Sequence, residues 1–178
     1  MGLSCRIEND GSLTVYNEST CLIKNMYPGI DGHPVHALQI IREDKRVVWV
    51  TAHGNIACRL PEADENCFAL EYALENYEVP VHTIHFFLLA DIQAEGFYQA
   101  AEGMGKDTGY YGKEEILKKG TLLSYGLCSL QYGKDFLTIY TTSQNHYETI
   151  CELNAGEKNR YTDGDDLRNM EEVAVSYT

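Results

Sequence analysis

The most apolar stretch of the chain reads Val81-His82-Thr83-Ile84-His85-Phe86-Phe87-Leu88-Leu89-Ala90. It follows Pro80, which is expected to end the helix predicted before it, and it is rich in the β-branched and aromatic residues that favour strands. A continuous apolar run of this length is typical of a strand buried on both faces. A membrane helix needs about 20 apolar residues, which this run does not supply. The stretch therefore predicts the central strand of a sheet in a soluble protein.

Three hairpins are predicted outside this strand, each with turn-forming residues between two segments of strand character. The first covers residues 4–17 and turns at Asn9-Asp10-Gly11-Ser12. The second covers residues 37–51 and turns at the charged residues 42–45. The third covers residues 121–142 and turns at residues 132–135. Polar or glycine-containing turns between such segments are the short-range signal of hairpins, so the sheet is expected to be mainly antiparallel.

Helices are predicted at three places between the hairpins. The longest covers residues 61–77, because Pro61 suits a first helical turn and apolar residues repeat at helical spacing. The repeating apolar residues are Cys67, Leu70, Leu74 and Tyr77. Two short helices are predicted at residues 91–102 and 113–119. One longer helix and one or two short helices beside a mainly antiparallel sheet define an α+β fold.

Length and composition favour a single domain. The 178 residues are 44% hydrophobic and 23% charged, which supplies enough apolar side chains for one core. Residues 1–155 are predicted to form this compact α+β domain. Residues 156–178 are predicted to be an acidic, loosely held C-terminal tail, because residues 154–166 contain almost no apolar side chain.

The ends of the chain and its cysteines favour a reducing compartment. The N-terminus, Met1-Gly2-Leu3-Ser4-Cys5-Arg6, has no apolar region of the kind that directs secretion. The six cysteines are scattered and include no C-x-x-C pair, so neither a disulfide framework nor a structural zinc site is expected. We therefore expect free thiols and a cytoplasmic protein, in the cytoplasm of the host if the gene is carried by a phage.

Sequence motifs indicate no metal, cofactor or catalytic group. His82 and His85 are three residues apart in the predicted central strand, where this spacing directs them to opposite faces. His33 and His36 lie around Pro34 and have no third ligand at a recognisable spacing. Nucleophile motifs of the G-x-S-x-G type are also missing. The sequence thus weakens the case for an enzyme without removing it.

Charge is the feature that stands out. The chain has 27 acidic and 14 basic residues, a formal net charge of −13, which disfavours nucleic acid and anionic membranes as direct partners. Residues 60–105 contain nine carboxylates and no Lys or Arg. On the predicted helix Glu71, Glu75 and Glu78 form one row, with carboxylates about 6 Å apart. This spacing is close to that of successive phosphates in a nucleic acid strand.

These observations favour a protein-binding function. We expect an inhibitor or decoy that occupies a basic, nucleic-acid-binding surface of a target protein. Its predicted contact residues are Glu71, Glu75, Glu78, Tyr72, Asp64 and Glu65. The small acidic anti-restriction and anti-CRISPR proteins of phages and mobile elements resemble the chain in size and charge only, and that resemblance implies an anti-defence role.

Two other functions remain open. One is an enzyme or small-ligand-binding protein with a pocket near His82 and His85, where a histidine would act as an acid–base group. The other is a structural or assembly subunit. The chain has thirteen tyrosines, many of them in its C-terminal half, and tyrosine-rich hairpins could pair their edge strands with a second copy to form a homodimer.

Overall fold

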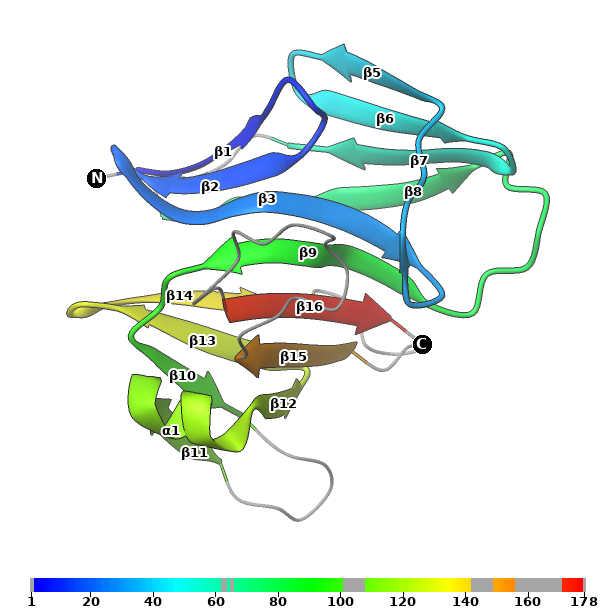
Figure 1. Cartoon of the computed structure of the whole chain (residues 1–178). Coiled ribbons are helices and arrows are strands. Elements are labelled where there is room, and N and C mark those ends of the chain that lie inside the picture. Colours follow the sequence, from blue (N-terminus) through cyan, green and yellow to red (C-terminus); the bar gives the residue numbers. More distant parts are fainter. Residues whose placement is uncertain are drawn as a thin grey trace.

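The structure is a computed structural model that describes residues 2–61, 64, 66–100, 108–141, 149–155 and 171–177. Within these residues the chain forms sixteen strands and one helix, α1 (Lys113–Lys119). The strands make three sheets, which are labelled in Figure 1. The predicted α+β class is therefore wrong, because the protein is nearly all β.

The main sheet has eight strands and forms the middle of the molecule (Figure 1). Its strand order is β1-β2-β3-β9-β16-β15-β12, and the short β4 also pairs with β3. Every pair in it is antiparallel. Its strands are β1 (Leu3–Ile7), β2 (Leu13–Asn17), β3 (Thr20–Ile30), β4 (His33–Pro34), β9 (Ile84–Ile92), β12 (Thr121–Tyr125), β15 (Thr149–Ala155) and β16 (Glu171–Tyr177).

Strand β9 contains most of the apolar stretch that the sequence places at the centre, and this prediction is confirmed. It pairs with β3 on one edge and with β16 on the other. Phe87, Leu88 and Ile92 are buried, although successive side chains of a strand point to opposite faces. Both faces of β9 are therefore covered, as expected for a strand without a polar face.

The second sheet packs on the β1–β3 end of the main sheet. It contains β5 (Gln39–Glu43), β6 (Arg46–Thr51), β7 (Gly54–Arg59) and β8 (Glu71–Glu75), in that order. Trp49 of β6 is fully buried, and its ring meets the edge of Tyr27 of β3 at a centroid distance of 5.8 Å. This aromatic contact joins the two sheets, so Trp49 closes the interface between them.

The third sheet lies toward the other end of the molecule (Figure 1). Its order is β11-β10-β13-β14, from β10 (Gly96–Gln99), β11 (Gly109–Gly112), β13 (Leu127–Tyr132) and β14 (Asp135–Tyr140). Phe97, Cys128 and Leu130 on its inner face are fully buried. At the end of β13, the Tyr132 hydroxyl donates a hydrogen bond of 2.9 Å to the carbonyl oxygen of Leu22 in β3.

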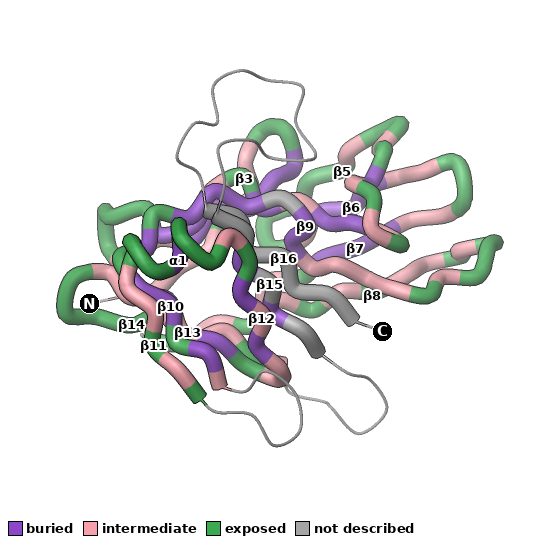
Figure 2. Tube along the Cα trace, turned by 60° about the horizontal axis from the view of Figure 1, so that its bottom comes forward, coloured by how far each residue is buried: buried purple, intermediate pink, exposed green. Residues whose placement is uncertain are grey.

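One continuous core connects the three sheets. It includes Leu13 and Leu153 of the main sheet, Trp49 of the second, and Phe97 and Leu130 of the third. Figure 2 shows buried residues along β3, β6, β7 and β9, whereas β5 and β14 are largely exposed or intermediate. The edges of the smaller sheets therefore form much of the protein surface.

The three predicted hairpins are present, but two of the three predicted helices are not. The pairs β1–β2, β5–β6 and β13–β14 match the predicted hairpins, with Thr121–Tyr125 leaving the third one to join the main sheet. The helix predicted at residues 113–119 is α1. Residues 71–75 of the predicted long helix form β8, and residues 91–102 contain the end of β9 and β10. Strand pairing prevails over helix propensity in both places, because β8 pairs with β7 and β10 pairs with both β11 and β13.

The tail predicted at residues 156–178 falls largely outside the described residues. Residues 156–170 are outside the described residues. Glu171–Tyr177 form β16, whose backbone pairs with both β9 and β15. The predicted division at residue 155 stays a prediction.

Cysteine burial gives a direct test of the fold. All six cysteines are free, with Cys21 and Cys67 exposed and Cys58, Cys128 and Cys151 buried. Burial raises the pKa of Cys5 and of Cys58 to about 12, so neither is a ready nucleophile at neutral pH. Ellman's reagent is expected to react rapidly with two thiols in the native protein and with six after denaturation without reductant. Fewer than six under denaturing conditions would reveal a disulfide and contradict the free thiols.

Candidate functional site

The predicted acidic row does not exist as a row, because its residues lie on a strand. Glu71 and Glu75 begin and end β8, and Glu78 lies beyond the strand. Residues four apart on a strand are about 13 Å apart, compared with about 6 Å on a helix. The carboxylates therefore lose the phosphate-like spacing on which the helical arrangement depended, and that part of the prediction is wrong.

Glu75 forms an ion pair with Arg46 of the same chain. The Arg46 guanidinium donates hydrogen bonds from Nη2 to both carboxylate oxygens of Glu75, at 2.9 and 3.0 Å. Arg46 also lies 3.7 Å from Glu43, measured from Nη1 to Oε2. Arg46 stands opposite Arg59 in the sheet, so its side chain must cross the outer face of β7 to reach Glu75.

Tyr72, a predicted contact residue, is partly buried and packs against the core between two sheets. Its ring stacks on Trp49 at a centroid distance of 6.2 Å and an interplanar angle of 1°. Its hydroxyl donates a hydrogen bond of 2.7 Å to the carbonyl oxygen of Phe86 in β9. Burial raises the pKa of Tyr72 well above its usual value. Tyr72 therefore links the second sheet to the main sheet.

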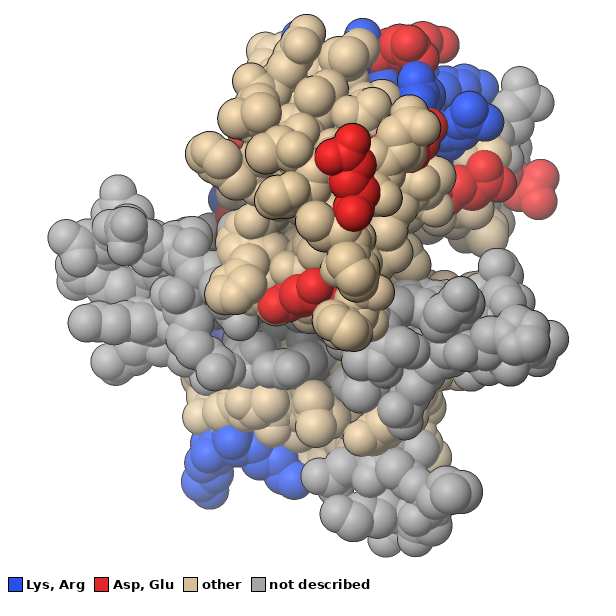
Figure 3. All heavy atoms as spheres, turned by 90° about the vertical axis from the view of Figure 1, so that its right-hand side faces the viewer, with Lys and Arg blue, Asp and Glu red and all other residues tan. Residues whose placement is uncertain are grey.

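The other predicted contact residues lie apart from one another. Asp64 is exposed and forms an isolated bridge with Cys67, and Glu65 lies outside the described residues. Glu71 and Glu78 are exposed, and the Glu78 amide donates a hydrogen bond to the carbonyl oxygen of His53. In the view of Figure 3 some acidic side chains stand apart on uncharged surface, and others lie beside Lys or Arg side chains. Among the described residues, these carboxylates form no compact cluster.

His82 and His85 have structural contacts at the entry to β9. Two backbone amides, of His82 and Thr83, donate hydrogen bonds to the Asp31 carboxylate at 2.9 and 2.7 Å. The His85 Nε2 atom accepts a hydrogen bond of 3.0 Å from the Gly32 amide. These contacts hold the turn between β3 and β4. The described part of the chain contains no group of three metal-ligating side chains.

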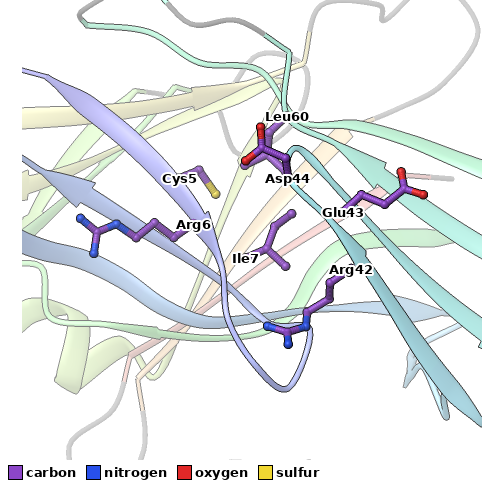
Figure 4. Close-up of a pocket in the computed structure, with 7 residues that line it drawn as sticks. All are labelled: Cys5, Arg6, Ile7, Arg42, Glu43, Asp44 and Leu60. Carbon is purple, nitrogen blue, oxygen red and sulfur yellow. The ribbon is translucent and has the colours of Figure 1, made fainter.

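Two open pockets lie away from these histidines. One has a volume of about 330 Å³ and lies between β1 and the β5–β6 turn. Figure 4 shows Ile7 and Arg42 facing this space across from Asp44, while the Arg6 guanidinium points away. The other, of about 450 Å³, is lined by polar residues of β2, β3 and the β1–β2 turn. Their open shape and mixed charges provide no enclosed site for a small ligand.

The structure reveals a surface that sequence reasoning missed, the outer face of the third sheet. Four side chains on it, Tyr98, Tyr110, Phe136 and Tyr140, are between 44% and 57% exposed, and we call them the aromatic face. Tyr98 lies directly opposite Tyr110 and also opposite Ser129 of β13. In the sequence these aromatic residues occur at alternating positions within strand segments. Only the register of the paired strands shows that their side chains share one face.

A hydrogen bond holds one ring of the aromatic face, that of Tyr110, in place. Tyr110 donates a hydrogen bond from its hydroxyl to Gln131 Oε1, and Gln131 Nε2 donates one of 2.7 Å to the Gly133 carbonyl oxygen. A Cβ atom at Gly96 would lie 2.5 Å from the Tyr110 hydroxyl, so glycine leaves the space that this ring fills. The ring of Tyr110 is therefore fixed over β10 instead of swinging freely in solvent.

Charge is distributed unevenly over the described residues. The four strands of the third sheet contain one charged residue, Asp135. Elsewhere on the described surface both ion pairs use Arg46, so exposed carboxylates such as Glu71, Glu95 and Glu114 keep their charge unneutralised by a salt bridge. Asp91 is withdrawn from the surface, and its burial raises its pKa. An aromatic sheet with a single charged residue thus lies within an acidic molecule.

Comparison with known proteins finds no match: no family model, no curated protein and no solved structure corresponds to the chain. The described residues also include no helix with the length and apolar character needed to cross a membrane. Functional inference therefore depends on the surface chemistry described above.

Proposed function

We propose that this protein acts by binding a protein with a basic surface, in the cytoplasm. The observation that carries the proposal is the net charge of −13, and ion pairs between described residues involve only the carboxylates of Glu43 and Glu75. Exposed charges of one sign attract a partner of the opposite sign over long distances and raise the association rate. A protein with a positively charged surface is the partner that this negatively charged molecule would attract.

A basic surface that binds nucleic acid is the narrower form of the proposal. Such a surface already accepts a dense array of negative charge. The acidic protein would compete with nucleic acid for it and thereby act as an inhibitor or decoy, as an anti-defence protein does. The phosphate-like spacing of carboxylates on one helix does not support the decoy function, because residues 71–75 form a strand. Its support is the overall excess of acidic residues, which is spread over several elements.

An affinity experiment tests the proposal through charge. The variant Glu71→Gln, Glu78→Gln, Glu95→Gln, Glu114→Gln removes four exposed charges, none of which is in an ion pair with another described residue. Wild type and variant are immobilised and exposed to the same bacterial lysate at low salt, and the captured proteins are identified. Association of a captured protein is expected to be several-fold slower with the variant, and its salt dependence weaker.

Aspartate at the same four positions is the matched control, because it keeps the charge. The captured protein should also lose its nucleic acid when wild type is added. Equal capture by wild type and the glutamine variant, or nucleic acid binding that is unaffected by the protein, would overturn the decoy function. Glu75 is left unchanged because its loss would break the pair with Arg46.

A further inference from the structure

We propose that the aromatic face is where the basic partner docks, and that its exposed rings bind arginine side chains of that partner. This inference depends on the proposed function, since it supplies the contact surface for the same partner. In this inference the third sheet makes the specific contacts, and the net negative charge of the molecule attracts the partner.

The size of the face suits the centre of a larger interface. Four strands of about five residues each span roughly 300–400 Å². A partner in a stable complex contributes roughly 800 Å², so contacts must extend beyond the sheet to its charged surroundings. Aromatic side chains at the centre and charged residues at the rim are the usual arrangement of protein interfaces. In a dimer of this chain, two copies that each carry a charge of −13 would repel, whereas a basic partner would be attracted.

The orientation of the rings favours side chains over flat ligands. Tyr98 and Tyr110 have centroids 5.2 Å apart and planes inclined by 50°. Tyr98 and Phe136 are 6.1 Å apart and inclined by 74°. Rings at these angles share no common plane on which successive bases or sugars could stack. The spaces between them suit separate, elongated side chains, and arginine combines that shape with a planar cation.

The molecule already contains the interaction that we propose. Arg6 lies over the ring of Tyr16 at 4.6 Å, and Lys119 lies over the ring of Tyr111 at 4.4 Å. None of the four rings of the aromatic face has such a cation among the described residues. Tyrosine and phenylalanine rings attract guanidinium groups through the negative charge on their faces. Four exposed rings without their own cations, on a molecule with a net charge of −13, therefore suit a partner rich in arginine.

Two peptides of equal charge distinguish binding of arginine by the aromatic rings from attraction by charge alone. Nona-arginine and nona-lysine are titrated into the full-length protein at low and at physiological salt, and dissociation constants are measured by calorimetry. Wild type is expected to bind nona-arginine about fivefold more tightly than nona-lysine at physiological salt. Tyr98→Ser, Phe136→Ser, Tyr140→Ser should remove this preference while leaving nona-lysine binding unchanged.

Two further variants make the result specific. Tyr98→Leu, Phe136→Leu, Tyr140→Leu keeps an apolar face without rings, and it should also lose the preference for arginine. Leu38→Ser with Val79→Ser removes exposed apolar side chains elsewhere, which are 67% and 41% exposed, and it should behave as wild type. Circular dichroism and thermal unfolding verify that each variant is folded.

The outcomes separate this inference from the proposed function. Equal affinity of wild type for the two peptides, unchanged in the serine variant, overturns the role of the aromatic face and leaves charge-driven binding intact. Failure of both peptides to bind at low salt overturns the proposed function together with this inference. Dimerisation of wild type that the serine variant abolishes would assign the face to a second copy of the chain, and would also overturn the inference.

Discussion

Replacing Trp49 with alanine is expected to lower the free energy of unfolding by about 3–5 kcal/mol, the usual cost of removing a buried aromatic side chain. Trp49 is fully buried, stacks on Tyr72 and meets the edge of Tyr27. Its removal would leave a cavity between two sheets that meet through these rings. Domains of this size are stable by about 5–15 kcal/mol, so the loss is a large share of the total. Urea unfolding followed by circular dichroism measures the effect.

Phenylalanine at the same position is the matched control. The indole Nε1 atom of Trp49 is buried and has no hydrogen-bond partner among the described residues. An unsatisfied buried donor costs about 1–3 kcal/mol, so Trp49→Phe loses ring area but also removes this cost. We expect it to destabilise far less than alanine. A loss below about 1 kcal/mol for Trp49→Ala would mean that the second sheet does not pack on the main sheet through this residue.

The part of the fold that the sequence predicts best is determined by local pattern. Strand β9 and the three hairpins each contain a signal within a short window, either an apolar run or a turn between two strand-like segments. The single helix among the described residues, α1, also has local signals, with acidic residues in its first turn and lysines in its last. Such elements can be read from sequence because their own residues determine them.

The main error in the predicted fold comes from a segment whose sequence fits both a helix and a strand. Residues 67–77 show apolar residues at helical spacing, and they are rich in Ala, Leu and Glu, which favour helices. The same window alternates between inward Tyr72 and Leu74 and outward Glu71 and Glu75, which is the strand pattern. Strand β7 supplies an open edge, and Tyr72 fits between Trp49 and Phe86. Both determinants lie elsewhere in the chain, so the window alone could not reveal them.

The candidate site was harder to predict because it depends on register. Leu60 to Gly105 contains no Lys or Arg in sequence, yet pairing of β6, β7 and β8 brings Arg46 to Glu75. The aromatic face likewise combines residues from the strands of the third sheet, and only their pairing brings the rings together. Composition shows only that the chain is acidic and rich in tyrosine, whereas the position of the aromatic face requires the paired strands.

Replacing Gly54 with alanine is expected to cost about 3 kcal/mol of unfolding free energy, through backbone strain and a steric clash together. Gly54 begins β7 after the β6–β7 turn and has a φ of +139°, which residues with a Cβ rarely adopt. A Cβ there would lie 2.6 Å from both the Asn76 carbonyl oxygen and the Tyr77 Cα. Backbone atoms cannot turn aside as a side chain can, so the end of β8 would have to move.

Gly133→Ala separates the two contributions. Gly133 also has a positive φ, +61°, but nothing lies within 4 Å of a Cβ placed on it, so only backbone strain of about 1–2 kcal/mol is expected. Urea unfolding of both variants gives the difference. Because the Glu78 amide bonds to His53 in the same turn, Gly54→Ala should also move Glu78, whereas Gly133→Ala should not. Equal losses of stability in the two variants would mean that β8 does not end against this turn, and that Glu78 does not lie beside His53.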